Sequence, residues 1–315
     1  MGLTRDRKAI TARGARPDLA TPALPPLPVP LLWTPDETPS VILVGFGYWG
    51  TANALPGTVV DLYRMATLAR DVLHTNNVLI ISDITVEETV ENLRQVILEG
   101  DLATDVMSFV KEMTARHQWV ALTPRLDLDT FIRRMTVGKG LVYFSGHGRD
   151  GYGIFPDGRL WNFDTLLASV GKDSRGEWVF IVDCCHTDTF GLPFTASPDL
   201  VWIRNNYGLW YGRVLVLASS APDETSTTSQ RGSSFTRELC AGIRAHFGLV
   251  DLLKSARSNS SAVFNASFPC ALDLFDWMRP DCLVRQSVWG GYVLRKRKVL
   301  PVKVEVDVPE PLLTD

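Results

Sequence analysis

Short apolar runs alternate with amphipathic stretches from residue 40 onward, and this rhythm predicts a βαβ organisation. The runs 141–145, 179–184 and 214–219 are apolar at nearly every position, with little polar alternation. Strands buried on both faces have this pattern, whereas strands with one solvated face alternate. The other expected strands are 41–46 and 78–81, and the expected helices are 59–72, 85–98, 129–135, 235–246 and 249–257. We therefore expect an α/β fold in which helices cover a mostly parallel sheet.

Some segments depart from this rhythm. Residues 1–39 carry basic residues and then a proline-rich run, and proline breaks helices, so we expect a flexible extension before a domain at 40–315. A removable propeptide and a plain tail both fit this extension. Residues 219–234 are small and polar, as in an exposed loop, and residues 260–287 show no clear period. The stretch 288–308 is expected to be strand-rich, and its tail, 299–308, is expected to cover a sheet edge and keep the protein monomeric.

The composition is that of a globular protein, since 45% of the 315 residues are hydrophobic. A net charge of -3 gives no general attraction to nucleic acid or to an anionic membrane, so we expect neither as a partner. The five cysteines are odd in number, and two of them are adjacent. This suits a reduced protein better than a disulfide framework, and we expect a cytoplasmic location.

Two of the expected strands end in reactive side chains, within Ser145-Gly146-His147-Gly148 and Asp183-Cys184-Cys185-His186. Open α/β sheets place their chemistry at the carboxyl ends of parallel strands. A histidine upstream of a cysteine, each at a strand end, is the layout of a cysteine nucleophile and its base. We assign Cys185 as the nucleophile, His147 as the acid and base, and the backbone amides of Gly148 and Cys185 as oxyanion donors. The sequence thus predicts a cysteine-type endopeptidase.

These two motifs together resemble those of the metacaspases, caspase-like cysteine peptidases whose motifs read S-G-H-G and D-x-C-H-S-G. Residues 43–61 resemble the family's first strand and following loop, with Asp61 in place of its acidic residue and Thr58 in place of its usual cysteine. Residues 218–226 resemble the stretch that the family writes near S-G-C-x-D-x-Q-T-S. The resemblance implies a caspase-like three-layer sandwich with a six-stranded, mostly parallel central sheet. It also implies cleavage of peptide bonds after Arg or Lys.

The acidic residues near the expected site agree with such a preference. We expect Asp61, Ser145 and Asp183 to bind the substrate in one crevice, with Asp223 at its rim. Two carboxylates in a partly desolvated pocket favour a guanidinium or ammonium group and disfavour an acidic one. The expected partners are therefore protein or peptide substrates with Arg or Lys before the scissile bond. Alternatively, each carboxylate alone caps a helix or anchors a loop.

The chain also departs from the family pattern. Cys185-His186-Thr187-Asp188 stands where the family has C-H-S-G, so the turn loses a glycine and gains a charge. The acids after Gly148 are scattered rather than paired, so we expect no metal or other cofactor and no calcium dependence.

Activation and function each leave alternatives open. Arg231, in the polar loop, is a candidate for self-cleavage in a zymogen, and a plain surface arginine fits equally well. A catalytically silent caspase-fold scaffold with an interaction or regulatory role is the alternative function. A different Cys/His-dependent acyl transferase is a third.

Overall fold

The computed structural model describes residues 41–84, 100–122, 127–135, 139–171, 177–187, 190–196, 202–205, 213–245, 249–258, 260–267 and 304–305. All of them lie in the second of the two units into which the chain divides, residues 33–315. The extension expected at 1–39, the helix expected at 85–98 and most of the stretch 288–308 lie outside the described residues. The domain boundary at residue 40 therefore stays a prediction.

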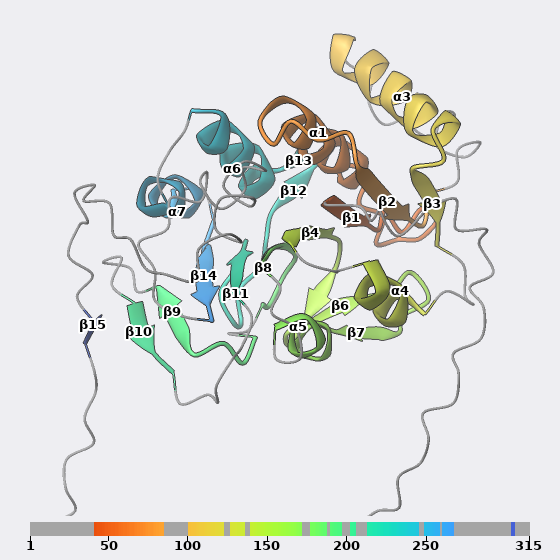
Figure 1. The fold of residues 1–315 in the computed structure, drawn as a ribbon. Coiled ribbons are helices and arrows are strands. Elements are labelled where there is room, and N and C mark those ends of the chain that lie inside the picture. Colours follow the sequence, from red (N-terminus) through yellow and green to blue (C-terminus); the bar gives the residue numbers. More distant parts are fainter. Residues whose placement is uncertain are drawn as a thin grey trace, which may run out of the picture. The chain divides into compact units, whose positions relative to one another are not determined.

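A long mixed sheet forms the centre of this unit (Figure 1). Its strands in the described part of the chain run in the order β15-β10-β9-β14-β11-β8-β4-β1-β2-β3. Six consecutive strands are parallel: β11 (Arg213–Ala218), β8 (Glu177–Asp183), β4 (Lys139–Ser145), β1 (Val41–Gly45), β2 (Val78–Ser82) and β3 (Trp119–Ala121). This parallel core agrees with the fold class expected from the apolar runs.

The sheet continues beyond the six strands that were expected. Beside β11 lie β14 (Val263–Ala266), β9 (Phe194–Ala196) and β10 (Trp202–Arg204), each antiparallel to its neighbour, and then β15 (Val304–Glu305) pairs in parallel with β10. The predicted strand number was thus too low. These added strands have at most four residues, which is too few for a hydrophobic period to show.

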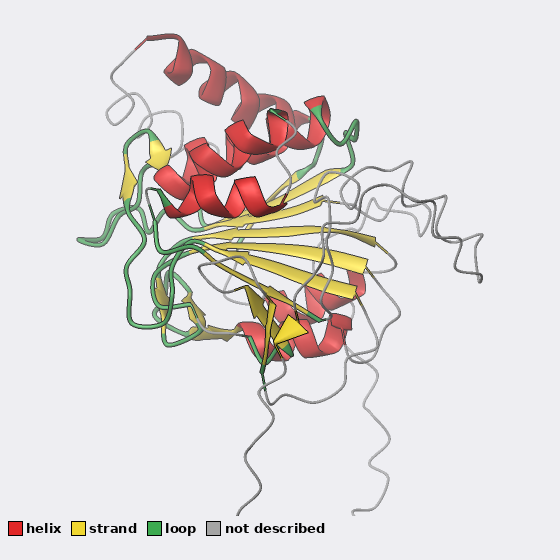
Figure 2. Ribbon diagram, turned by 90° about the vertical axis from the view of Figure 1, so that its left-hand side faces the viewer, coloured by secondary structure: helices red, strands yellow, loops and turns green. Residues whose placement is uncertain are grey.

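Helices cover both faces of the sheet (Figures 1 and 2). On one face lie α1 (Thr58–Asp71), α6 (Ser234–Arg244) and α7 (Leu249–Arg257), and α3 (Gly100–Ala115) packs against α1. On the other face lie α4 (Leu128–Met135), α5 (Phe163–Gly171) and a small antiparallel sheet of β5 (Gly148–Arg149), β6 (Tyr152–Ile154) and β7 (Leu160–Asn162). The result is the expected three-layer α/β sandwich. None of the described helices is long and apolar enough to cross a membrane.

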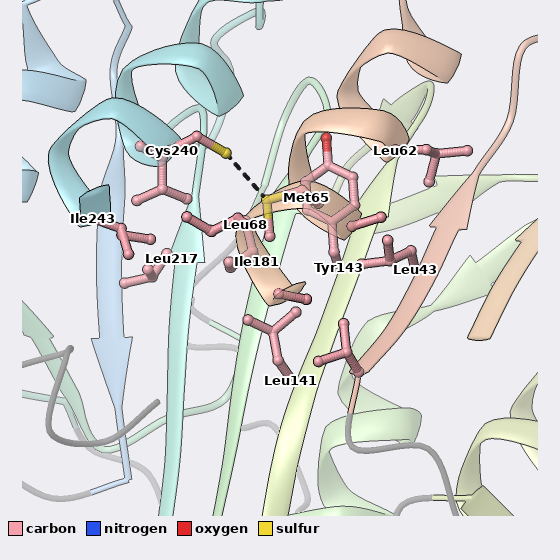
Figure 3. Close-up of a cluster of buried hydrophobic side chains, with 14 of the residues drawn as sticks. Leu43, Leu62, Met65, Leu68, Leu141, Tyr143, Ile181, Leu217, Cys240 and Ile243 are labelled. Carbon is pink, nitrogen blue, oxygen red and sulfur yellow. Dashed lines mark hydrogen bonds between the residues drawn. The ribbon is translucent and has the colours of Figure 1, made fainter. Parts of the chain in front are cut away.

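The larger core lies between the parallel strands and the helices α1 and α6 (Figure 3). Each central strand contributes a buried side chain to it, and the helices meet these with their apolar faces: Leu43, Leu141, Ile181 and Leu217 from the strands, Leu62, Met65 and Leu68 from α1, and Cys240 and Ile243 from α6. Because successive strand residues point to opposite faces, a slip of one residue would turn this set away from the helices. Packing therefore fixes the register of the strands.

That register aligns the strand ends that carry the two motifs. Ser145, the last residue of β4, lies opposite Gly45 of β1 and Asp183 of β8, and Val182 lies opposite Ala218 of β11. The chain segments that follow these four strands consequently leave the sheet at the same edge. This is where α/β sheets bind ligands.

Candidate active site

The segments after β1, β4, β8 and β11 enclose a cavity of about 80 Å³ at this edge. It is lined by Leu55, Thr58, Ser145, Gly146, His147, Asp183, Cys184, Cys185, Ser226, Thr228 and Ser233. The structure therefore brings the reactive residues of both motifs, His147 and Cys185, to one cavity. A larger cavity, of about 240 Å³, lies between α1 and α3, and neither cysteine nor histidine lines it.

The two motifs touch through their backbones. A Cβ atom added to Gly148 would collide with the carbonyl oxygen of Cys185 and would lie 2.5 Å from the Sγ atom of Cys184. The N–H of Gly146 donates to the carbonyl oxygen of Asp183 at 3.3 Å. The glycines of the first motif thus allow the second to approach closely. The two residues predicted as oxyanion donors, Gly148 and Cys185, are neighbours in space.

The imidazole of His147 is held by the loop that follows β1. Its Nε2 atom lies 2.8 Å from the backbone carbonyl oxygen of Asn53. A carbonyl oxygen only accepts hydrogen bonds, so Nε2 must carry the proton. In the neutral ring, Nδ1 is then the bare nitrogen that can accept a second proton.

The sulfur of Cys185 is held by the loop that follows β11. Its Sγ atom accepts the backbone N–H of Ser226 at 3.3 Å and lies 3.8 Å from the carbonyl oxygen of the same residue. This N–H points at the sulfur, where a hydrogen bond can accompany nucleophilic attack. Among the described residues, no hydrogen bond joins this sulfur to the ring of His147. Such catalytic contacts commonly close only when substrate is bound.

The other two described cysteines are suited to packing. Cys184 and Cys240 are both buried, whereas Cys185 is half-buried. Burial raises the pKa of Cys184 well above its ordinary value and the pKa of Cys240 to about 12. Both side chains therefore stay as uncharged thiols near neutral pH.

Asp183 and Ser145, two of the expected substrate-binding residues, line the cavity and are nearly buried. The carboxylate of Asp183 accepts the hydroxyl of Ser226 at 3.0 Å and that of Thr236 at 2.6 Å. The second contact follows from the start of α6, where the hydroxyl of Ser233 caps the helix by accepting the N–H of Thr236. Asp183 therefore faces the cavity and also anchors two neighbouring segments.

Asp61 lies behind this cavity. Its two carboxylate oxygens accept the backbone N–H of Ser233 at 3.1 and 2.9 Å, and Nη1 of Arg64 lies 3.3 Å from one of them. Burial, and next the nearby charge of Asp183, raise the pKa of Asp61 well above its ordinary value. The structure thus places Asp61 close to Asp183 but engages it with the protein's own groups.

The remaining predicted residues lie outside the cavity lining. Asp223 is exposed in a turn, with a φ of 64°. Arg231 is exposed at the tip of a hairpin formed by β12 (Thr228–Ser229) and β13 (Gly232–Ser233). Self-cleavage at Arg231 stays a prediction. The loop expected at 219–234 therefore contains a hairpin that contributes Thr228 and Ser233 to the cavity wall.

The altered turn after the nucleophile is well anchored. His186 has a φ of 52°, and its N–H donates to the carbonyl oxygen of Glu224 at 2.8 Å. Thr187 is buried, and its hydroxyl donates to the carbonyl oxygen of Ser220. Asp188 lies outside the described residues. The threonine that replaces the family's serine thus ties this turn to the loop after β11.

Several residues at the site were missed by sequence reasoning: Tyr48, Asn53, Asp83, Ser226 and Thr236. Asn53 contributes a backbone carbonyl, which no side-chain pattern reveals. Ser226 lay within the stretch that resembles the family, which was the available signal.

In the described part of the chain, no group of three or more His, Cys, Asp or Glu side chains is placed to hold a metal ion. Calcium independence stays a prediction.

Comparisons with known proteins give one family match. The family model of the caspase domain matches residues 127–270, which include both motifs. A search of curated proteins finds no match. Solved structures to which the chain is similar include caspase-1 from Spodoptera frugiperda, with 14% identity over 73% of this chain and 84% of that one and a TM-score of 0.38. They also include pro-sf-caspase-1, with 14% identity over 70% of this chain and 78% of that one and a TM-score of 0.35. A third is a structural-genomics target from Geobacter sulfurreducens, with 16% identity over 77% of this chain and 98% of that one and a TM-score of 0.41.

The family match and the sheet topology give the chain a caspase-like α/β fold. They support a place in the clan of caspase-like cysteine peptidases, whose substrates are proteins.

Proposed function

We propose that this protein is a metacaspase-like cysteine endopeptidase that cleaves after Arg or Lys, with Cys185 as nucleophile and His147 as acid and base. The observation that carries the proposal is the shared cavity: His147, Cys185 and Asp183 line it together, at the ends of the two strands β4 and β8. A nucleophile, a base and a carboxylate at one strand edge are what hydrolysis after a cationic residue requires.

Acylation begins with proton transfer. Nδ1 of His147 accepts the thiol proton of Cys185, because Nε2 already donates to Asn53. The thiolate, which the N–H of Ser226 contacts, attacks the substrate carbonyl carbon, and backbone amides near Gly148 stabilise the oxyanion. The C–N bond then breaks, and His147 gives its proton to the leaving amine. The substrate's acyl group remains on sulfur as a thioester.

Deacylation reverses the roles. His147 takes a proton from water, and the hydroxide attacks the thioester carbonyl. The C–S bond breaks, the sulfur leaves as a thiolate, and the imidazolium returns the proton to it. The products are a new carboxylic acid, which ionises by releasing its proton to water, and the regenerated enzyme.

The preference for a basic residue is supported by Asp183. This carboxylate lines the cavity beside Ser145, whereas Asp61 stands behind Ser233 with Arg64 as its partner. We therefore assign the main attraction for an incoming guanidinium to Asp183. Its charge also disfavours an acidic side chain, by like-charge repulsion.

The proposal is tested first by removing the nucleophile. Cys185→Ala should lower hydrolysis of an arginyl fluorogenic peptide by about 10³-fold or more, because no other group at the site forms the thioester. Cys240→Ala, at a buried cysteine that does not line the cavity, is the matched control and should keep wild-type turnover. Continued turnover by Cys185→Ala would refute the assignment.

A second measurement tests the specificity. A peptide library digested by the wild type should show cleavage after Arg and Lys, with mass-spectrometric identification of the cut bonds. A preference for Asp or Glu before the scissile bond would overturn the role given to Asp183.

An arginyl chloromethylketone separates this proposal from its alternatives. We expect covalent labelling at Cys185, seen by intact mass, in the wild type and in Cys240→Ala. A folded wild type that is not labelled would instead indicate a silent scaffold. Faster transfer of the acyl group to an added amine than to water would indicate an acyl transferase.

A further inference from the structure

The side chain of Tyr48 touches His147 in two ways. Its hydroxyl accepts the backbone N–H of His147 at 2.8 Å and donates to the carbonyl oxygen of Ile154 at 2.6 Å. Its ring lies against the imidazole, with 4.5 Å between ring centroids and an interplanar angle of 51°. One side chain therefore fixes both the backbone and the ring of the histidine.

Tyr48 is itself held in an unusual conformation. Its φ of 51° lies in the left-handed region, which bulky residues rarely adopt. The backbone N–H groups of Gly47 and Tyr48 donate to the two carboxylate oxygens of Asp83, each at 2.7 Å. A strained backbone persists only where its surroundings determine it, and such strain concentrates at functional sites.

The neighbouring motif leaves room for this hydroxyl. A Cβ atom added to Gly146 would lie 2.9 Å from the hydroxyl oxygen of Tyr48 and 3.0 Å from the ring of Phe144. The glycine before His147 thus makes the Tyr48 contact possible. Burial raises the pKa of Tyr48 well above its ordinary value, so the hydroxyl keeps its proton and remains a donor to Ile154.

These contacts converge on one residue from one loop. Residues 46–57 supply the ring and hydroxyl of Tyr48 and the carbonyl oxygen of Asn53, so they meet His147 at its imidazole face, its backbone N–H and its Nε2 atom. An imidazole held at the face and at Nε2 has little freedom to turn about its χ angles. The orientation of the ring decides which nitrogen can exchange a proton with Cys185.

We propose that Tyr48 is a positioning residue for His147, which orients the imidazole so that Nδ1 is kept for proton exchange with Cys185. The inference rests on the proposed function, since it concerns how that function's base is held. Tyr48 itself does not touch the reacting atoms. Misplacement of a catalytic group by about 1 Å can cost on the order of 100-fold in rate, so such support is kinetically important.

The test compares Tyr48→Phe and Tyr48→Leu with the wild type as full-length chains. Tyr48→Phe keeps the ring against the imidazole and loses both hydroxyl bonds, whereas Tyr48→Leu loses the ring as well. For an arginyl peptide we expect kcat to fall about 3- to 10-fold in the first variant and about 30- to 100-fold in the second, with KM changed less than about twofold. Tyr63→Phe, on α1 away from the cavity, is the matched control and should keep wild-type kinetics.

A readout independent of activity follows the imidazole itself. With ¹⁵N-labelled histidine, long-range ¹H–¹⁵N spectra should show His147 in the wild type as one neutral tautomer that is protonated at Nε2. The His147 signals are assigned by their loss in His147→Gln. Tyr48→Leu should show both tautomers, and Tyr48→Phe should be intermediate.

An unchanged tautomer in a folded Tyr48→Leu variant would overturn the inference, and so would a loss of activity that falls entirely in KM. If Tyr48→Leu does not fold, as judged by circular dichroism, Tyr48→Phe decides by the same two readouts. Should the wild type cleave no arginyl peptide, the proposed function fails. The tautomer comparison then still decides whether Tyr48 orients His147.

Discussion

The loop after β1 and the loop after β11 hold the two halves of the proposed dyad by different means. Residues 46–57 hold the imidazole of His147 through an aromatic ring, a phenol and a backbone carbonyl. Residues 219–233 hold the sulfur of Cys185 through the backbone N–H of Ser226, whose hydroxyl is bound to the carboxylate of Asp183. The first support is mostly packing and backbone, and the second is a network of buried polar groups.

Each side chain of the dyad therefore has a support of its own, and among the described residues no hydrogen bond joins the two side chains. Each can therefore be disturbed separately, with separate consequences. Buried polar networks weaken sharply when one member is removed, whereas packing and backbone contacts tolerate substitution more gradually. We expect the sulfur side to be the more fragile of the two.

The largest effect should come from Asp183, which supports the sulfur side. Asp183→Ala removes the acceptor of the Ser226 and Thr236 hydroxyls, and we expect a loss of about 2–4 kcal/mol in the free energy of unfolding. Hydrolysis of an arginyl peptide should fall by about 100-fold or more, because the proposed partner of the guanidinium is lost as well.

Asp183→Asn separates these two losses. The amide keeps an acceptor oxygen but carries no charge, so urea unfolding should show a smaller loss of stability while kcat/KM stays as low as in the alanine variant. Wild-type kcat/KM in either variant would contradict the role given to this carboxylate.

The next effect concerns the point where the two loops meet. A Cβ atom added to Gly57 would collide with the carbonyl oxygen of Ser229 and would lie 2.8 Å from Gly232. Because these are backbone atoms, which cannot turn aside, Gly57→Ala should cost about 1–3 kcal/mol of unfolding free energy and displace the β12–β13 hairpin. Ala54→Ser, an exposed change in the same loop, is the control and should stay within about 0.5 kcal/mol of the wild type. Equal stability of the two variants would show that the loops do not press on each other.

A smaller effect concerns pH and Asp61, which lies beneath that hairpin. The folded-state pKa of Asp61 is raised, chiefly by burial and then by Asp183, with Arg64 acting in the opposite direction. Its contribution to stability is therefore full below the unfolded pKa, near 3.8, and is lost as the pH rises through the higher folded value. Urea unfolding from pH 4.5 to 8 should show Asp61→Asn gaining stability relative to the wild type as the pH rises. A difference that is constant with pH would mean that Asp61 titrates alike in both states.

The smallest effect should come from Ser226. Ser226→Ala keeps the backbone N–H that reaches Cys185 but loses the bond to Asp183, and we expect about 1 kcal/mol less stability. The alkylation rate of Cys185 by iodoacetamide should fall about 3- to 10-fold, because the N–H is no longer held against the sulfur. Ser226→Thr retains the hydroxyl and should restore the rate. An unchanged alkylation rate in Ser226→Ala would show that the hydrogen bond between Ser226 and Asp183 does not influence the sulfur of Cys185.

The sequence pattern was a good guide to the centre of the fold. The apolar runs predicted five of the six parallel strands, all but β3, and α7 begins and ends at the predicted residues. The helix α3 was not predicted, although Leu102, Val106, Phe109 and Met113 follow a helical spacing. That omission was a failure to use an available pattern. The short strands β9, β10 and β14 are different, because three or four residues carry no readable period.

The candidate site was predictable to the level of motifs. Strand ends brought His147 and Cys185 to one cavity, and their chemical roles remain predictions. The position of Asp61 behind Ser233 depends on how the hairpin folds over α1, which residues distant in sequence decide. The residue type alone shows that Asp61 has a carboxyl group, but not which groups that carboxyl contacts.

The contact between His147 and the backbone carbonyl oxygen of residue 53 affects how the sequence of this site can change in evolution. Since every amino acid carries a main-chain carbonyl, exchange of the residue at this position does not by itself remove the acceptor that orients the histidine. Only a change in the path of the loop, such as an insertion or a deletion, removes it. Related chains are thus free to vary in identity at this position while being constrained in loop length.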